Sequence, residues 1–512
     1  MELSFYTLKD KILGCFNGKN VGGVLGAPFE GIRQINDIDF YIQNLDKNPP
    51  PNDDLDLQLV WLNAVEKFGR QTDAKILAEY WVSYIVPNWV EYGTGKSNLR
   101  AGLMPPFSGD IENSYKNSCG CFIRSELWAC LAAGHPELAV RYAYEDAIVD
   151  HASEGMYAEI FTAAVQSAAF LESDKYKLID IGLSYIPDNC AVKKAVKLII
   201  DCYKSKTTVQ EARMKILSEV PGNFGIQGTK IKDFKEDVPW GEPGFDAPGN
   251  IGILVLGWLY GEDDFAKSLC IAVNCGEDTD CTAATLGAIF GIIYGDSRLP
   301  EKWKAPLGGV INTCSIDRTS GIPIPNTVEE LTDRILRVIP SFLGSEYCDI
   351  LYKGDGFSLT TLEDSELFCK KTDEYIPLIN GGGKPKELRI DQLLELSPNG
   401  VKYDFNTFFA ILNYEPFIKL NEPCKLTLAI HDNGLTRHQQ WVDIKVYTPD
   451  GINVLEGRHF SAPLQNTYRY KTEKEFTITA ESITSNKVEI LIDISVSGRP
   501  TYGVVKAVLF AN

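Results

Sequence analysis

Residues 274–282 read NCGEDTDCT and run directly into residues 283–291, which read AATLGAIFG. Gly276 permits a sharp turn, and Asp278 and Asp280, two residues apart, can point their carboxylates at a common centre. Such spacing presents oxygens to a hard cation, for example Mg²⁺ or Ca²⁺. The small residues that follow predict a helix that packs closely against its neighbours. Carboxylates on such a helix cost free energy unless a metal ion or protons compensate their charge.

A second acidic cluster also precedes an apolar helix. Residues 52–61 read NDDLDLQLVW. Asn52 or Asp53 can cap the helix, and acidic groups in the first turn suit the helix dipole, so capping alone would explain this cluster by itself. Two clusters of this kind outweigh that interpretation and indicate charges that a metal ion or protons must compensate.

Three motifs rich in glycine or acidic residues occur in this order along the chain: GKNVGGVLGAPFE at 18–30, NDDL at 52–55, and GEDTDC at 276–281 followed by GAI and YG. They resemble the G-x-x-x-G-D-x-L-G-x-P-x-E, T-D-D-T and G-G-D-T-D-T…G-A-I…Y-G motifs of the ADP-ribosylglycohydrolase (dinitrogenase reductase-activating glycohydrolase) family. A weaker match is GCFIR at 120–124 with DHA at 150–152, which resembles the N-G-x-x-M-R and T-H segments of that family. The resemblance spans residues 14–300.

The resemblance implies an all-α orthogonal helical domain with a centre of two Mg²⁺ ions, or of one. Such a domain cleaves the bond at C1 of an ADP-ribosyl ribose in a small-molecule or protein-linked glycoside. The metal ligands that it implies, at the matching positions, are Asn52, Asp53, Asp54, Asp278, Asp280 and Cys281.

The resemblance also implies the catalytic and substrate-binding residues. Glu30 would act beside the metals, as a ligand or as the residue that positions the attacking water, and Asp53 and Asp280 would share in catalysis. His151 would contact the substrate ribose. Arg124 would help to hold the pocket, in the same segment as Gly120.

The sequence departs from the family pattern at several positions in and around the metal centre. Gly23 stands where the family has Asp, and Asn52 stands where it has Thr but could still offer a carbonyl oxygen. Cys119 replaces an Asn. Cys281 replaces the closing Thr ligand with a soft sulfur, which suits Mg²⁺ poorly. Either Thr282 or water then fills that position, or one metal is weakly held.

The chemistry can also be followed from the residues themselves. Two hard cations can chelate vicinal hydroxyls of a sugar and lower the pKa of a bound water, while carboxylates stabilise an oxocarbenium-like state. Glu30 or one of the aspartates could be the general base. Three alternatives remain: metal-free catalysis by two carboxylates roughly 5–9 Å apart, a sugar substrate other than ADP-ribose, and a catalytically silent ADP-ribose or sugar-binding module.

A loop rich in glycine and proline precedes the helix that leads to the acidic cluster at 274–282. In residues 240–250 (WGEPGFDAPGN), Phe245 could stack on a base or sugar and Asp246 could accept hydroxyl groups, although a plain connection is equally compatible. Residues 92–97 (YGTGKS) lack the spacing of a phosphate-binding loop, so that function is rejected.

The composition limits the classes of partner that the protein could bind. The 512 residues carry 50 Lys and Arg against 69 Asp and Glu, a net charge of −19. This charge argues against a nucleic-acid partner and against docking on an anionic membrane. Thirteen cysteines without CxxC pairs predict buried free thiols in a reducing cytoplasm. No stretch has the length of a membrane span, and charges near residue 10 argue against a signal peptide.

The chain changes character near residue 380. Before it, helix formers recur with apolar residues at three-to-four spacing, as at 54–68, 136–149 and 154–171. After it, alternating runs separated by turns predict strands at these positions: 403–412, 424–430, 440–447, 468–478, 487–496 and 502–510. We therefore predict an all-α catalytic domain at 1–345, a connecting region at 346–385 that includes a glycine-rich linker at 380–385, and an all-β sandwich at 386–512.

Overall fold

The computed structural model describes residues 2–220, 244–344, 347–350, 357–362, 366–369, 402–405, 407–432, 439–464 and 471–511. It divides into a helical unit and a unit that holds the C-terminal strands. The predicted linker at 380–385 and both predicted domain boundaries lie outside the described residues, so the exact boundaries stay a prediction.

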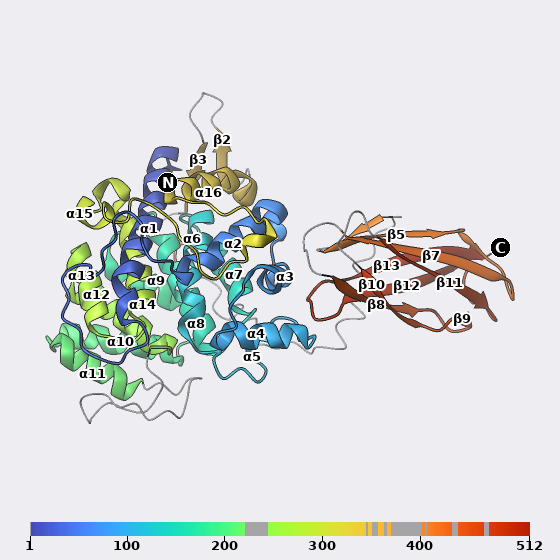
Figure 1. Cartoon of the computed structure of the whole chain (residues 1–512), viewed down its shortest axis with the longest axis horizontal. Helices are drawn as coiled ribbons and strands as arrows, with labels where there is room; N and C mark the ends of the chain where they lie inside the picture. The colour runs from blue at the N-terminus through green and yellow to red at the C-terminus, as the bar shows by residue number, and fades with distance from the viewer. Residues whose placement is uncertain are drawn as a thin grey trace. The chain divides into compact units, whose positions relative to one another are not determined.

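The described part of the first unit is built from helices (Figure 1). Their bounds are α1 Phe5–Gly26, α2 Asp53–Phe68, α3 Ala74–Tyr84, α4 Val90–Arg100, α5 Phe107–Asp110, α6 Glu126–Leu131, α7 Pro136–Ala147, α8 Ser153–Ala168, α9 Lys175–Ser184, α10 Ala191–Lys204, α11 Val209–Glu219, α12 Ala247–Tyr260, α13 Phe265–Asn274, α14 Thr279–Tyr294, α15 Glu301–Lys304 and α16 Val328–Leu343. With the strands described below, they confirm the predicted fold class. Within the described residues, none of these helices has the length and apolar character needed to cross a membrane.

Helices α1 and α14 pack backbone against backbone. A Cβ atom added to Gly18 would lie 2.1 Å from the carbonyl oxygen of Gly287, and one added to Gly22 would lie 2.0 Å from that of Ala283. Only hydrogen fits at such separations, so glycine is required there. We call this contact the glycine seam; it consists of Gly14, Gly18, Gly22 and Gly26 of α1 and Thr279, Ala283, Gly287 and Gly291 of α14.

The glycine seam is antiparallel, and this orientation positions the acidic motifs. The end of α1 meets the start of α14, where the Thr279 hydroxyl donates a hydrogen bond to the carbonyl of Gly26 at 2.8 Å. The residues that follow α1 therefore lie beside the residues that open α14. Close packing of the predicted small-residue helix is thereby confirmed.

A small sheet joins the N-terminus to the segment after α16. Its strand order is β1–β3–β2, with β1 at Glu2–Leu3, β2 at Cys348–Ile350 and β3 at Phe357–Thr360. The sequence pattern predicts no strand in this part of the chain. Strands of two to four residues are too short to produce a detectable alternation, and their pairing is long-range.

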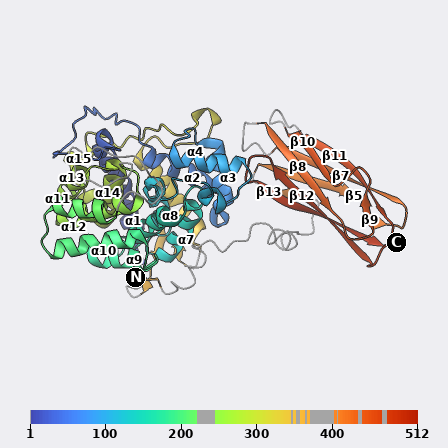
Figure 2. The same cartoon turned by 90° about the horizontal axis from the view of Figure 1, so that it is seen from below.

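The C-terminal strands form two five-stranded sheets, of order β10–β8–β12–β13–β6 and β4–β5–β7–β11–β9 (Figures 1 and 2). Their bounds are β4 Lys402–Asp404, β5 Phe408–Tyr414, β6 Phe417–Ile418, β7 Pro423–Asp432, β8 Gln440–Tyr447, β9 Ile452–Val454, β10 His459–Leu464, β11 Lys471–Ala480, β12 Lys487–Val496 and β13 Tyr502–Ala511. Buried side chains from both sheets form one apolar core, so the sheets pack face to face as a sandwich.

One predicted strand is in fact a hairpin. The run 403–412 divides into β4 and β5, which pair antiparallel with Lys402 opposite Ile411. The chain reverses where Phe405 donates its N–H to the carbonyl of Phe408 at 2.9 Å. The alternation of the run hid this reversal, because both arms carry aromatic and apolar residues.

Candidate metal centre and pocket

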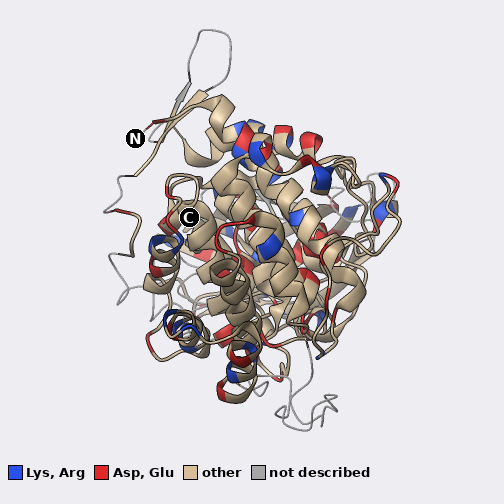
Figure 3. Cartoon of the chain, turned by 90° about the vertical axis from the view of Figure 1, so that its left-hand side faces the viewer, with Lys and Arg blue, Asp and Glu red and all other residues tan. Residues whose placement is uncertain are grey.

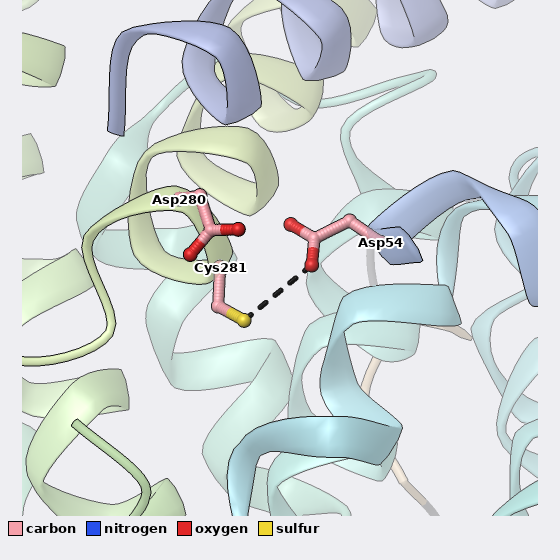
Figure 4. Close-up of side chains that lie close together, drawn as sticks. All are labelled: Asp54, Asp280 and Cys281. Carbon is pink, nitrogen blue, oxygen red and sulfur yellow. Dashed lines mark hydrogen bonds between the residues drawn. The ribbon is translucent and has the colours of Figure 1, made fainter. Parts of the chain in front are cut away.

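The first turns of α2 and α14 bring two buried carboxylates and a thiol together. Asp54, Asp280 and Cys281 each offer one ligand atom, and these atoms lie within 4.8 Å of one another. The Cys281 thiol donates a hydrogen bond to Oδ1 of Asp54 at 3.5 Å. In Figure 4 the three side chains face one another across the gap between the two helices.

A second group of carboxylates shares Asp280. Oxygens of Glu30, Asp278 and Asp280 also lie within 4.8 Å of one another. Glu30 directly follows a short 3₁₀ helix, Ala27–Phe29, that continues α1. The antiparallel seam thus places Glu30 beside the start of α14. The structure brings acidic residues from three sequence motifs to one place.

A left-handed turn directs the start of α14 into this cluster. Gly276 has φ +72° and Glu277 has φ +66°, a backbone conformation that glycine adopts freely and Glu adopts at a cost. The Glu277 carboxylate is held by Arg33, at 2.6 and 3.0 Å. Main-chain hydrogen bonds pair Glu277 with Ile32, two residues after Glu30. The predicted sharp turn at Gly276 is confirmed.

Two departures from the family pattern are neighbours in space. Asn52 caps α2, where its Oδ1 accepts the N–H of Asp54 at 2.8 Å. A Cβ atom added to Gly23 would lie 2.4 Å from the Nδ2 atom of Asn52. The glycine at position 23 therefore leaves the space that the larger cap occupies, and the two replacements fit each other.

The charge of the cluster calls for a compensating cation or protons. Asp54, Asp278 and Asp280 are only 2 to 3% exposed. Burial, followed by a neighbouring carboxylate in each case, raises their pKa well above the usual range. Each keeps one buried oxygen that finds no hydrogen-bond partner in the described part of the chain: Oδ2 of Asp54, Oδ1 of Asp278 and Oδ1 of Asp280.

The buried carboxylates of this cluster are suited to bind a divalent metal ion. Unpartnered buried oxygens are costly unless protons or a cation satisfy them, and carboxylates are the ligands that hard cations take. A buried Lys19 lowers the pKa of Asp54 only in part, because its ammonium group is also paired with Glu126 at 3.2 Å.

A pocket with an empty volume of about 690 Å³ opens beside the cluster. The predicted site residues on its wall are Glu30, Asp53, Asp54, Gly120, Phe245, Asp278 and Cys281. Asp280 belongs to the cluster without lining this pocket, and Asn52 lines a smaller neighbouring cavity. Of the predicted loop 240–250, residues 240–243 lie outside the described part of the chain.

Three predicted substrate-binding residues are buried and do not line the pocket: Arg124, His151 and Asp246. Arg124 donates to the carbonyl of Gly120 at 2.7 Å, and Nε2 of His151 lies in a hydrogen bond with Ser118 at 2.9 Å. Asp246 pairs with Ser118 through an isolated main-chain bridge. These residues thus support the wall residues Gly120 and Ser118.

Sequence reasoning missed the wall that the start of α4 contributes. Trp89, Glu91 and Tyr92 line the pocket, and the Trp89 and Tyr92 rings stack with centroids 6.1 Å apart. The Tyr92 hydroxyl donates to Oδ2 of Asp53 at 3.3 Å. Residues 92–97, which lack the spacing of a phosphate-binding loop, are part of this helix. No local signal could have linked them to motifs elsewhere in the chain.

Glu91 makes stability depend on pH. Its carboxyl group is buried in the pocket wall, and burial raises its pKa from 4.5 to about 7. A raised carboxyl pKa stabilises the folded state at low pH, and this contribution is lost as the pH rises toward and through 7. We expect Glu91→Gln to exceed the wild type in stability at pH 8 by up to about 3 kcal/mol, at about 1.4 kcal/mol per pKa unit.

Thermal or urea unfolding of both proteins between pH 5 and 8 measures this difference for Glu91→Gln. The gap should shrink toward pH 5, where the wild-type carboxyl is protonated in the folded protein. A gap that is constant with pH, or that widens toward low pH, would contradict the assignment.

Comparisons with known proteins now identify the helical region. The family model described as ADP-ribosylglycohydrolase matches residues 5–341, which is more than half of the chain. The chain belongs to the ADP-ribosylglycohydrolase family. In this family member, the three matching motifs are the segments that form the carboxylate cluster.

Individual relatives match less extensively. The ADP-ribosylarginine hydrolase Tri1 of Serratia proteamaculans (strain 568) is 40% identical over 45 residues, which make up 9% of this chain and 12% of that protein. The match therefore spans a small part of that relative. A solved structure titled ADP-ribosylglycohydrolase-related protein complex has a TM-score of 0.42 and 18% identity, and covers 66% of this chain and 99% of its own.

The surface of this ADP-ribosylglycohydrolase family member carries charges of both signs. On the face drawn in Figure 3, acidic and basic residues are interspersed along the helices. Part of the acidic charge of the chain is buried at the carboxylate cluster, in Asp54, Asp278 and Asp280.

Proposed function

We propose that the helical region is a Mg²⁺-dependent glycohydrolase. It cleaves the glycosidic bond at C1 of an ADP-ribosyl or related ribosyl or sugar group, with water as the attacking group. The observation that carries this proposal is the set of unpartnered, buried carboxylate oxygens at a pocket wall. Such oxygens serve a metal-assisted hydrolase and would otherwise only destabilise the fold.

The residues that would hold Mg²⁺ are Glu30, Asp53, Asp54, Asp278 and Asp280. When bound, the metal supplies a water of lowered pKa and offsets negative charge on oxygen. Asn52 supports this set as the cap of α2, and Cys281 is the one donor of the predicted set that is soft.

The protein side of the chemistry is binding, orientation and proton transfer. Glu30 is the candidate base, because its carboxylate lies on the pocket wall, within 4.8 Å of ligand oxygens of Asp278 and Asp280. Tyr92 holds Asp53 in place. The exposed ring of Trp89 and the ring of Phe245 offer faces on which a base or sugar can stack.

Metal binding is the first test. We expect wild-type protein to bind Mg²⁺ in isothermal titration calorimetry, and the double variant Asp278→Asn plus Asp280→Asn to lose this binding, because it removes ligands from both groups. Asp110→Asn, which alters an exposed carboxylate paired with Lys116, is the matched control and should bind like the wild type. Equal binding by wild type and double variant would contradict the metal centre.

Hydrolysis is the second test. A panel should contain ADP-ribosyl-arginine, because a partial relative is named an ADP-ribosylarginine hydrolase, along with other ADP-ribosyl conjugates and simple glycosides. Release of the sugar product by wild type and its loss in the double variant are expected. Cys281 at the place of a hydroxyl ligand favours a second candidate, a silent ADP-ribose or sugar-binding module. Mg²⁺ binding without cleavage of any panel member would support that candidate.

A further inference from the structure

The Cys281 thiol lies where a metal ligand is expected, and its neighbours point to a metal. Its Sγ lies within 4.8 Å of oxygens of Asp54 and Asp280, and the three side chains converge in Figure 4. Cys281 is 7% exposed and Asp54 and Asp280 are 2 and 3% exposed. We call these three residues the soft corner, and the group Glu30, Asp278 and Asp280 the hard corner.

An independent observation indicates that a ligand belongs in the soft corner. Within the described residues, Oδ2 of Asp54 and Oδ1 of Asp280 have no hydrogen-bond partner, although both are buried. The other oxygen of Asp54 accepts the long hydrogen bond from Cys281 at 3.5 Å. A thiol is a weak donor, so this contact compensates little of the charge of two buried carboxylates.

Cys119, a second thiol on the same pocket wall, is held differently. Its sulfur accepts a hydrogen bond from the amide of Asn250 at 3.1 Å and donates to the carbonyl of Gly244 at 3.7 Å. Cys119 therefore has partners other than Asp54 and Asp280, although Asp278 also lies beside it. The contrast makes it the natural control for Cys281, since both thiols are buried beside the same pocket.

The donor set decides which cation each corner prefers. Thiolate sulfur is a soft ligand that favours Zn²⁺ and Co²⁺, whereas Mg²⁺ takes oxygen ligands and dehydrates reluctantly. The hard corner offers oxygens only and suits Mg²⁺. The soft corner offers one sulfur and two oxygens, and a mixed set of this kind is one that Zn²⁺ accepts.

We propose that the soft corner binds a thiophilic divalent cation of the Zn²⁺ class through Sγ of Cys281 and carboxylate oxygens of Asp54 and Asp280, beside a Mg²⁺ position in the hard corner. This inference rests on the proposed metal centre and specifies its composition. On binding, the thiol releases its proton to solvent and a metal–sulfur bond forms, with no change in oxidation state. Asp280 would contribute to both positions.

Co²⁺ is the probe, because a cobalt–thiolate bond gives a charge-transfer absorption that cobalt–oxygen bonds lack. We expect wild-type protein titrated with Co²⁺ to show this absorption, and Cys281→Thr and Cys281→Ser to lose it. Cys119→Ser should retain it. Each variant is first shown to melt like the wild type, and Cys281→Thr supplies a hydroxyl of similar size in case the serine variant is unstable.

Competition between Zn²⁺ and Mg²⁺ measures the metal selectivity of the soft corner. We expect Cys281→Thr to weaken Zn²⁺ binding by about tenfold or more while Mg²⁺ binding changes little, since even the loss of an outer partner of a metal ligand typically costs about 10–100-fold. Co²⁺ binding without the thiolate absorption, or the absorption lost in Cys119→Ser and kept in Cys281→Thr, would overturn the proposal.

The outcomes separate this inference from the proposed function. The thiolate absorption without hydrolysis of any glycoside would retain the mixed centre and remove the hydrolase. Hydrolysis with Mg²⁺ and no cobalt–thiolate bond would retain the hydrolase and remove the mixed centre. Absence of binding by Mg²⁺, Zn²⁺ and Co²⁺ alike would overturn both.

Discussion

Replacing Gly22 by Ala is expected to destabilise the helical region by on the order of 3 kcal/mol or more, the upper end of the cost of overpacking a well-packed interior. The added Cβ would lie 2.0 Å from the carbonyl oxygen of Ala283 and 2.2 Å from its carbonyl carbon. The opposing atoms are backbone, so no rotamer change can relieve the clash. Relief requires α1 and α14 to move apart along the glycine seam.

The same movement should disturb the metal centre, because the seam places Glu30 beside the start of α14. We therefore expect Gly22→Ala to lower the melting temperature and also to weaken Mg²⁺ binding in calorimetry, although Gly22 is no ligand. A substitution that only lowered helix stability would leave binding by the folded fraction unchanged.

Gly249→Ala in α12 is the matched control. It makes the same change within a helix, but in the described part of the chain the nearest atom to the added Cβ is 4.0 Å away, on the side chain of Ile216. The expected result is neutral or slightly stabilising, because Ala has the higher helix propensity by about 1 kcal/mol. Equal melting temperatures for Gly22→Ala and the wild type would contradict the close-packed seam.

Replacing Arg124 by Met is expected to destabilise the protein by about 3–5 kcal/mol, the usual cost of removing one partner from a buried ion pair. Arg124 is fully buried and holds Asp146 at 2.8 Å and Asp150 at 2.5 Å. Against the opposing effect of burial, Arg124 and then His151 keep the pKa of Asp150 below its usual range. The variant leaves two carboxylates buried without their cation.

Denaturant unfolding of Arg124→Met measures this cost, and Arg124→Lys tests its origin. Lysine restores the charge but cannot reach Gly120 and both carboxylates at once, so partial recovery is expected. Lys425→Met, which breaks an exposed pair with Glu475 on the β-sandwich, should leave stability unchanged within error. A loss in Arg124→Met no larger than in Lys425→Met would contradict the structural role.

The predicted fold class followed from local patterns and is borne out by the structure. Apolar spacing of three to four residues marked the helices, and alternation marked most strands, because both periods reflect how side chains point from a single element. Secondary structure was predicted wrongly, or not at all, where the spacing of apolar residues does not reveal the path of the chain. The run 403–412 alternates through a reversal of the chain, and α4 contains Gly93, Thr94 and Gly95, which weaken its helical pattern.

In the candidate site, too, residues with a local signal were predicted and residues brought in by long-range contacts were not. Acidic residues at helix starts were recognisable because Asp and Asn have a known role there, and their pairing in two motifs indicated a metal. The wall formed by Trp89, Glu91 and Tyr92 was missed, since its neighbours are distant in sequence. The resemblance implied that His151 contacts the substrate ribose and that Arg124 helps to hold the pocket. In the structure neither residue lines the pocket: His151 is hydrogen-bonded to the wall residue Ser118, and Arg124 to the wall residue Gly120.

The sequence by itself determined most of the helices and strands, the resemblance to the family, and the chemical types in the centre, including the sulfur at Cys281. Only the tertiary structure decided which of these groups meet. Convergence of Glu30, Asp54 and Asp280 depends on backbone contact between α1 and α14, and on a left-handed turn at Gly276 held through Arg33 and Glu277. Both features are long-range. The first is a contact between glycines on two different helices, and the second is an ion pair between residues far apart in the sequence. A local pattern can show that a glycine is present, but not which backbone lies against it.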